Sequence, residues 1–152
     1  MAVAFRIATP ADLDALVRLQ RVFYEAEGYC FEEPAARAAL HGLATDSGRG
    51  LLWVLDGDGG VHGYIAVSFG WSLEFQGRDA FVDELYLEPS YRGRGIGRAA
   101  LALAEQASRA AGVRALHLEV ERGNDAGRAL YQRSGFADQD RILMTKRLTP
   151  LR

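Results

Sequence analysis

The sequence predicts a single domain of the α/β (α+β) class, in which a mixed central β-sheet is flanked by helices on both faces. The chain has 152 residues, 49% of them hydrophobic, which suits one domain built around one core. Its first half carries a strong hairpin signal, which indicates antiparallel strands. Its second half alternates strand, helix and strand, which indicates a parallel pair joined by a crossover helix. A sheet with both kinds of pairing is mixed, and its connecting helices cover its faces.

The spacing of apolar residues and the turn residues between them place each element. Thr9, Pro10 and Asp12 form a helix start, with Thr9 as the N-cap. In chain order we expect a strand over 3–8, a helix that ends near Gly28, a loop over 24–33, a second helix from Pro34, strands over 51–55 and 61–69, a connection over 69–78, a strand over 80–87, a helix that stops at Gly112, a strand over 115–120, a short helix from Asn124 through Ser134, and a last strand over 142–148. The order is therefore β-α-α-β-β-β-α-β-α-β, in one domain over residues 1–152.

The composition excludes several classes of function. The net charge of −2 leaves no basic surplus for neutralising phosphates, so we expect no nucleic-acid partner. Cys30 is the only cysteine, which excludes an internal disulfide, and the histidines have no metal-ligand spacing. The sequence has no apolar run of membrane-spanning length and no signal-peptide pattern. We therefore expect a cytoplasmic protein with no metal and no membrane partner.

A glycine-rich turn from Tyr91 to Arg98 lies between the strand over 81–87 and the helix that follows. In this arrangement the free N–H groups of the helix N-terminus point at an anion, and the glycines let the main chain approach a phosphate. The turn lacks the Lys-Ser/Thr pair of a P-loop, and Arg98 stands where a Rossmann fingerprint has its third glycine. An ordinary turn that caps a helix is the alternative interpretation.

Two motifs resemble those of one family. The pattern Arg92-x-x-Gly95-x-Gly97 resembles the acyl-CoA pyrophosphate loop of the GNAT superfamily, the GCN5-related N-acetyltransferases. The stretch from Asn124 to Phe136 resembles the C-terminal motif of that family, although Gly127 or Arg128 stands where the family often has alanine. The resemblance covers nearly the whole chain and implies the same mixed-sheet fold, with acetyl-CoA as co-substrate. The residues expected to contact acetyl-CoA are Leu85, Tyr86, Leu87, Arg92, Gly93, Arg94, Gly95, Ile96, Gly97, Arg98 and Asn124.

The resemblance also suggests how the thioester is held and how its sulfur is protonated. In the family, the strand matching Leu85–Leu87 splays from the next one, and its backbone groups pair with the pantetheine amides and the thioester carbonyl. Tyr131 lies about 100° round its helix from the apolar stripe of Ala126, Ala129 and Leu130, so it can face a cleft. A phenol can protonate a leaving thiolate, the role that the resemblance assigns to Tyr131. A packed tyrosine with a solvated hydroxyl is the alternative.

Three acids compete for the role of the base that deprotonates the amine. Asp83 and Glu84 interrupt an apolar strand, and at most one shares the face of Tyr86, because successive strand residues face opposite sides. Glu119 stands twelve residues before Tyr131, as the base does in some members of the family. Glu84 is the first candidate, Glu119 the second and Asp83 the third. A solvated or structural carboxylate is the alternative for each.

The sequence thus predicts an acetyl-CoA-dependent N-acetyltransferase that moves an acetyl group to a primary amine by direct attack in a ternary complex. The sequence does not decide whether the acceptor is a small amine, a polyamine, an amino acid or a peptide. It also allows a homodimer. Aromatic and acidic residues that suit a cationic amine, or are simply solvated, are Tyr24, Glu25, Glu27, Tyr29, Glu32, Glu33, Trp71, Glu74 and Phe75. The alternative function is a non-catalytic acyl-CoA-binding sensor on the same fold.

Overall fold

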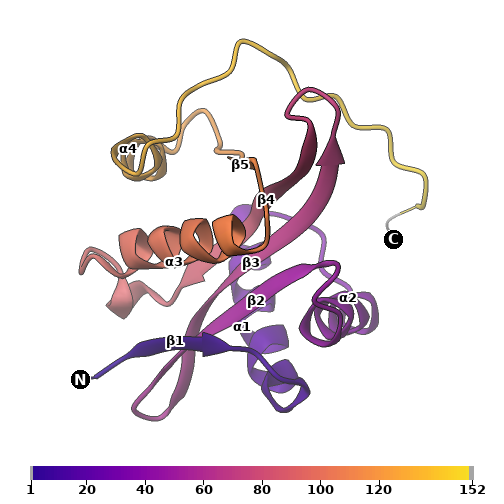
Figure 1. Cartoon of the computed structure of the whole chain (residues 1–152). Helices are drawn as coiled ribbons and strands as arrows, with labels where there is room; N and C mark the ends of the chain where they lie inside the picture. The colour runs from indigo at the N-terminus through magenta and orange to yellow at the C-terminus, as the bar shows by residue number, and fades with distance from the viewer. Residues whose placement is uncertain (1, 151–152) are drawn as a thin grey trace.

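A five-stranded sheet with the order β1-β2-β3-β4-β5 runs through the computed structural model, which describes residues 2–150. Neighbouring strands from β1 to β4 are antiparallel, and β5 is parallel to β4. In chain order the elements are β1 (Ala4–Ile7), a 3-10 turn (Pro10–Asp12), α1 (Leu13–Glu27), α2 (Glu33–Thr45), β2 (Gly50–Gly57), β3 (Gly60–Ser72), β4 (Gly77–Leu87), a second 3-10 turn (Pro89–Tyr91), α3 (Ile96–Ala110), β5 (Ala115–His117) and α4 (Asp125–Arg133) (Figure 1).

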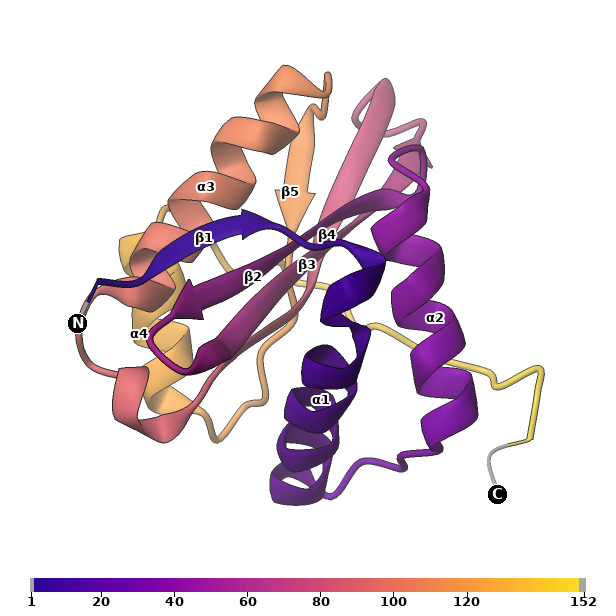
Figure 2. The ribbon, with the colours of Figure 1, turned by 90° about the horizontal axis from the view of Figure 1, so that it is seen from below.

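Helices cover both faces of this sheet. The helices α1 and α2 pack on one face, where Leu16 meets Tyr64 in one apolar cluster. On the other face α3 packs over a second cluster, in which Leu101 meets Ile65 and Val67. Figure 2 shows the two groups of helices on opposite sides of the strands, with α4 beside α3. The predicted class, a mixed sheet flanked by helices on both faces, is confirmed.

The helix ends follow the signals in the sequence. Ahead of α1, the backbone N–H of the N-cap residue Thr9 donates to Asp12 Oδ2 at 2.8 Å. Helix α1 ends at Gly28, whose φ of 74° is a left-handed value that glycine adopts without strain. Asn124 caps α4, because its Oδ1 accepts a hydrogen bond from the N–H of Gly127 at 2.9 Å. The predicted starts and stops at Thr9, Gly28 and Asn124 are therefore confirmed.

Two predicted loops are partly regular structure. The segment Tyr24–Glu27 belongs to α1 and is not a loop, because the aromatic residues at the end of this helix still have packing partners. The Phe23 ring, for example, stacks on Tyr86 of the sheet with 5.3 Å between ring centroids. The expected connection over 69–78 is mostly strand, since β3 continues to Ser72 and β4 begins at Gly77. Cross-strand pairing extends the hairpin beyond its apolar stretch.

The two predicted strands at the C-terminal end are wrong in different ways. Strand β5 ends at His117 and not at Val120, because its pairing with β4 stops there. The segment 142–148 forms no strand, because after α4 the chain passes the sheet without pairing with β5. A strand needs the hydrogen bonds of a neighbouring strand, and this segment has no such neighbour. The observed order therefore ends at α4 as β-α-α-β-β-β-α-β-α.

An extra residue in β4 sets the orientation of its second half. Val82 pairs with Val67 and Glu84 pairs with Ala66, which are adjacent on β3, so Asp83 is a β-bulge without a partner on that strand. Val82 packs in the cluster under α3, and regular alternation would send Glu84 to the same side. Because of the bulge, Glu84 lies instead on the side of α1.

Candidate active site

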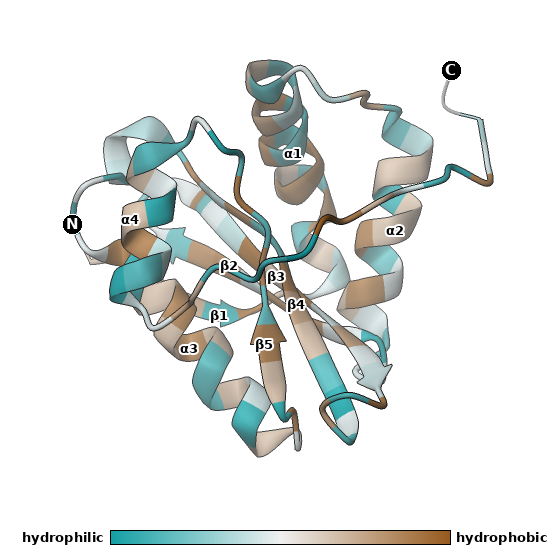
Figure 3. Ribbon diagram, turned by 90° about the horizontal axis from the view of Figure 1, so that it is seen from above, coloured by the Kyte–Doolittle hydropathy of each residue, from teal (hydrophilic) through white to brown (hydrophobic). Residues whose placement is uncertain are grey.

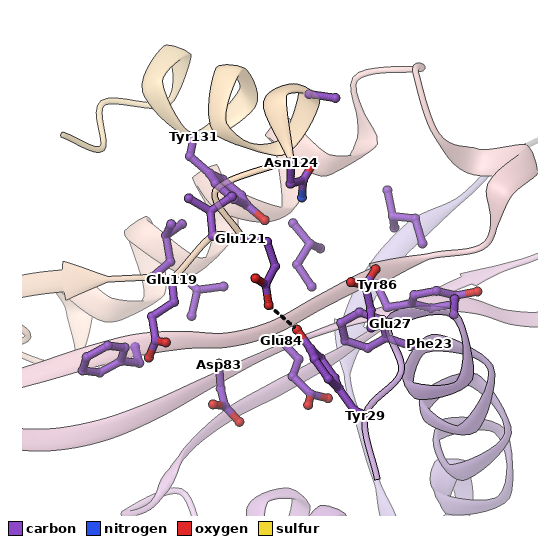
Figure 4. A pocket seen from close by; sticks show the side chains of 18 of the residues that line it. Phe23, Glu27, Tyr29, Asp83, Glu84, Tyr86, Glu119, Glu121, Asn124 and Tyr131 are labelled. Atoms are coloured by element: carbon purple, nitrogen blue, oxygen red, sulfur yellow. Dashed lines mark hydrogen bonds between the residues drawn. The ribbon is translucent and has the colours of Figure 1, made fainter. Parts of the chain in front are cut away.

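A cavity of about 910 Å³ opens where β4 and the chain after β5 diverge. Pairing between the two strands stops at Phe81 and His117, so the following part of β4, over 83–87, is uncovered on this side. The irregular segment 118–124 forms the opposite wall, and the end of α1 forms a third. Figure 4 shows side chains from these elements converging on the cavity. The strands therefore splay here, as the resemblance implied.

The glycine-rich turn lies at the end of the cavity where Arg92 lines it. Gly93 and Gly95 have φ values of 70° and 79°, in the left-handed region that favours glycine. Within residues 2–150, the backbone N–H groups from Gly93 to Arg98 donate to no other group. Helix α3 begins within this stretch, so its unpaired donors and the positive end of its dipole lie beside the cavity.

Close glycine contacts hold α4 in place at the cavity. A methyl group added at Gly97 would lie 3.3 Å from Leu130 Cδ2, so the missing side chain lets α3 and α4 approach. A methyl group at Gly127 would lie 2.5 Å from Asn124 Nδ2. The missing side chain at Gly127 therefore makes room for the side chain that caps this helix.

Tyr131 extends from α4 into the cavity (Figure 4). Its ring is half-buried and packs against the apolar cluster under α3 together with Leu130. Burial raises the pKa of the Tyr131 hydroxyl, which keeps it protonated at neutral pH. The predicted apolar stripe needs one correction, because Ala126 is exposed and lines the cavity instead of packing in the core. The short helix α4 turns only part of its predicted apolar face inward.

Glu84 is held by three donors from other parts of the chain. Its carboxylate accepts hydrogen bonds from Gln20 Nε2 at 2.9 Å, from Tyr64 OH at 2.8 Å and from Tyr24 OH. Burial, together with the Glu84 charge, raises the pKa of both tyrosines, so they remain donors. Both carboxylate oxygens are occupied, which makes Glu84 a link between α1, β3 and β4.

Asp83 and Glu119 differ from Glu84 in facing the cavity without such partners. Neither carboxylate accepts a hydrogen bond from another residue in the described part of the chain, and both side chains are exposed to the cavity. Partial burial in the cleft, and then repulsion from Glu84 and Glu119, raises the pKa of Asp83. A carboxyl with a raised pKa is a better proton acceptor near neutrality.

Acidic side chains also surround the rest of the cavity. Glu27 lines it from the end of α1, and Glu121 from the opposite wall. Tyr29 OH donates to Glu121 Oε1 at 3.1 Å, which joins the two walls (Figure 4). Arg92 is the single basic residue in the lining that the structure describes. The cavity therefore favours a cation at its centre.

Among residues 2–150 there is neither a cluster of three or more metal-ligating side chains nor a helix with the length and hydropathy to cross a bilayer.

Residues 13–136 match the model of the family described as "Acetyltransferase (GNAT) family". The chain belongs to the GNAT family. The matched range contains the glycine-rich turn, all the walls of the cavity and α4, so the candidate site lies within the GNAT domain.

Curated relatives share part of their length with this GNAT chain. An "Uncharacterized N-acetyltransferase YycN" from Bacillus subtilis (strain 168) is 39% identical over 71 residues, which cover 47% of this chain and 45% of the relative. A mycothiol acetyltransferase from Beutenbergia cavernae is 38% identical over 91 residues, which cover 57% of this chain and 28% of the relative. The chain thus spans less than half the length of these relatives.

Solved structures match over nearly the whole chain. The integron cassette protein HFX_CASS3, from the mobile metagenome of Cole Harbour Salt Marsh, has a TM-score of 0.86 and 34% identity, with 96% of this chain and 91% of that chain covered. An aminoglycoside N-acetyltransferase AAC(6')-Iy, solved in complex with CoA, has a TM-score of 0.82 and 15% identity, with 97% and 96% covered. The second likeness shows the GNAT fold alone.

The structure brings most of the predicted site residues to one cavity. Those that line it are Glu84, Leu85, Tyr86, Leu87, Arg92, Glu119, Asn124 and Tyr131. The turn residues Gly93, Arg94, Gly95, Ile96, Gly97 and Arg98 lie outside the lining, beyond Arg92. Of the suggested acceptor residues, Glu27 and Tyr29 line the cavity, whereas Trp71, Glu74 and Phe75 lie around the β3–β4 turn and do not.

Several residues of the site do not follow from the sequence. Gln20 and Tyr64 bind Glu84, and Glu121 binds Tyr29 across the cavity. Gln20 did carry a signal, because it is a polar residue on the buried side of an amphipathic helix. Tyr64, in an apolar strand, carried none.

Proposed function

We propose that this GNAT protein is an acetyl-CoA-dependent N-acetyltransferase that moves an acetyl group to a primary amine by direct attack in a ternary complex. The observation that carries the proposal is the splayed cavity, because it joins three components. Unpaired N–H groups lie at one end, a protonated phenol faces the interior, and carboxylates line the far side. These components suit a pyrophosphate, a leaving thiolate and an ammonium group, in that order.

Acetyl-CoA would bind along the uncovered edge of β4. The N–H groups from Gly93 to Arg98 would hold its pyrophosphate, assisted by the dipole of α3. The backbone of Leu85, Tyr86 and Leu87 has no strand partner on the cavity side, so it can pair with the pantetheine amides. An N–H in this stretch would stabilise the oxygen of the thioester carbonyl as it gains charge. Asn124 would border the same cavity from the start of α4.

In the chemical step, the amine nitrogen would attack the thioester carbonyl carbon, and the C–S bond would break as the C–N bond forms. We assign the removal of the amine proton to Asp83, because its exposed carboxylate has a raised pKa. Glu119 is the second candidate for that role. Tyr131 would give its hydroxyl proton to the leaving sulfur and would be reprotonated, by way of solvent, with the second proton that the nitrogen loses as the amide forms. Glu84 is assigned a structural role, since its oxygens are already occupied.

The acceptor would be a cationic amine. Glu27 and Glu121 lie on opposite walls of the cavity, with the aromatic rings of Phe23 and Tyr29 near them. Acids on opposite walls suit a substrate with a second positive charge away from the reacting nitrogen, such as a diamine or a polyamine. Like-charge repulsion would disfavour amines that carry carboxylates.

The experiment incubates the purified protein with acetyl-CoA and a panel of diamines, polyamines, amino acids and short peptides, and detects the acetylated product by mass spectrometry. Tyr131→Phe serves as the catalytic control. We expect acetylated product from at least one amine, with diamines and polyamines preferred. Binding of acetyl-CoA without product from any amine would favour the sensor function instead.

A further inference from the structure

A small apolar cluster, separate from the two that flank the sheet, holds both ends of the glycine-rich turn. Hydrophobic residues concentrate in the strands of the molecule (Figure 3), and Leu55 and Leu87 from two of them form this cluster with Tyr91. Tyr91 ends the 3-10 turn before the glycines and is only 4% exposed, and Ile96 at the start of α3 packs against the same cluster. Glycines make the segment between them, residues 92–95, adaptable, and ordering an adaptable segment on binding lowers affinity. The anchoring of its ends therefore determines how far the turn is arranged before a ligand binds.

The ring of His62 covers Tyr91 from the start of β3. The two rings are stacked, with 4.5 Å between their centroids and 18° between their planes. Since a carbonyl oxygen only accepts hydrogen bonds, His62 Nε2 is the donor in its 2.7 Å contact with the backbone oxygen of Asp58. This bond fixes the plane of the ring against the hairpin between β2 and β3. His62 does not line the cavity, so its influence on a ligand there passes through the residues that it contacts.

Glu88, the residue before this 3-10 turn, is connected to His62 by its backbone and by its side chain. The Glu88 N–H donates to the backbone oxygen of His62 at 2.9 Å, and the backbone oxygen of Glu88 accepts from the Tyr91 N–H at 2.9 Å. Glu88 Oε1 lies 3.6 Å from His62 Nδ1 and 3.5 Å from Arg18 Nη1 on α1. Within residues 2–150 the buried Nδ1 has no hydrogen-bond partner, so the ring is held by its Nε2 bond and by the stack. The start of the turn is thus fixed from β3 and from α1.

Arg94 extends the same set of contacts into the turn. Its guanidinium carbon lies 5.4 Å from the centre of the Tyr91 ring, a distance typical of a cation–π contact. The side chain is exposed, and Nη1 donates to the backbone oxygen of Ser90 at 3.5 Å. A guanidinium presents several donors in a planar fork that matches a phosphate. The Tyr91 ring therefore joins His62 to an exposed cation of the glycine-rich turn.

We propose that His62 is a positioning residue for acetyl-CoA binding. By stacking on Tyr91 it keeps Arg94 and the glycine-rich turn in the arrangement that receives the pyrophosphate, although His62 touches neither the cofactor nor the reacting atoms. The inference rests on the proposed function, because it assumes that this turn binds the pyrophosphate. The role predicts an effect on the pyrophosphate end of the donor alone, and none on the thioester, which the edge of β4 would hold.

Two donors test this role in the purified protein with its best amine acceptor. Acetyl-CoA carries the pyrophosphate, and S-acetylpantetheine carries the same thioester without it. His62→Leu fills the space of the ring but cannot stack, and we expect it to raise KM and the calorimetric Kd for acetyl-CoA ~3- to 10-fold, the size of one aromatic contact. Its kcat at saturation, and its kcat/KM with S-acetylpantetheine, should match the wild type. His62→Phe restores a flat ring and should recover most of the acetyl-CoA affinity.

His41→Leu is the matched control, because His41 is exposed on α2, and it should leave the kinetics with both donors unaffected. The inference is wrong if His62→Leu keeps the wild-type affinity for acetyl-CoA, if it weakens both donors equally, or if His62→Phe is no better than His62→Leu. A wild-type protein that binds no acetyl-CoA would overturn the proposed function itself, and this inference with it.

Nuclear Overhauser contacts in the wild-type protein keep the test decisive if His62→Leu fails to fold. A contact that positions the turn has to persist when the ligand is bound. In the complex with coenzyme A we therefore expect contacts between the His62 and Tyr91 rings, and between the Tyr91 ring and the Arg94 side chain. Loss of the contact between His62 and Tyr91 in that complex would overturn the proposal.

Discussion

The Glu84→Gln substitution separates a structural carboxylate from a catalytic one. It keeps the size of the side chain and replaces a charged acceptor of three hydrogen bonds by a neutral amide. Hydrogen bonds to charged groups contribute about 1.5–3 kcal/mol each, and neutral ones about 0.5–1.5 kcal/mol. The difference is about 1 kcal/mol per bond. Because Tyr64 is fully buried and Tyr24 only partly, we expect the free energy of unfolding to fall by about 2–3 kcal/mol.

Urea unfolding measures this loss, with Glu105→Gln as the matched control. Glu105 makes an exposed ion pair with Arg109 one helical turn away, so the control should stay within about 0.5 kcal/mol of the wild type. At a temperature where the Glu84→Gln variant is folded, its pH–rate profile should keep the shape of the wild-type profile. The reasoning would be refuted if this variant were as stable as the control, and an accompanying loss of the acidic limb would identify Glu84 as the base.

Four further predictions concern the proposed catalytic and cofactor-binding residues. Asp83→Asn should lower kcat by ~10²- to 10⁴-fold and flatten the acidic limb of the pH–rate profile, because a carboxylate accepts a proton only above its pKa, and the pKa of Asp83 is raised. If this variant keeps the acidic limb and Glu119→Gln loses it, Glu119 is the base instead. Since a raised pKa means that the ionised form opposes folding, Asp83→Asn should also be more stable than the wild type at pH 7 in urea, and the difference should shrink as the pH falls through that pKa. Tyr131→Phe should lower kcat by ~10²- to 10⁴-fold and leave the calorimetric Kd for acetyl-CoA nearly unchanged, whereas wild-type turnover would mean that water protonates the sulfur. Gly95→Glu should abolish acetyl-CoA binding in calorimetry. The control Gly95→Ala has the same backbone strain at a φ of 79° but no charge, so it should retain part of the binding. An equal loss of acetyl-CoA affinity in both variants would mean that strain alone is responsible.

Local signals account for the parts of the fold that the sequence predicted well. Caps at Thr9 and Asn124, the stop at Gly28 and the glycine-rich turn before α3 depend on neighbours within a few residues. For the same reason the sequence located the strand, turn and helix that meet at the cavity. These elements bring Arg92, Tyr131 and the acids of β4 together.

Contacts between residues far apart in the sequence account for the features of the fold and of the site that the sequence did not predict. Asp83 and Glu84 are equivalent by composition, and only the register between β3 and β4 decides which of them is bulged. The donors that occupy Glu84 come from α1 and β3, far from it in the sequence. The segment 142–148 has the composition of a strand, but composition does not say whether a strand edge lies beside it.

The bulge at Asp83 makes that residue dispensable for the pairing of β4, because Val82 and Glu84 on either side of it already pair with adjacent residues of β3. Deleting Asp83 would restore regular alternation and leave the residues that follow on the faces that they have now. The Glu84 carboxylate would stay with the donors of Gln20 and Tyr64, and Leu85 would stay in the apolar cluster under α3. A single lost codon would thus remove the proposed base from the cavity without turning the wall that carries it.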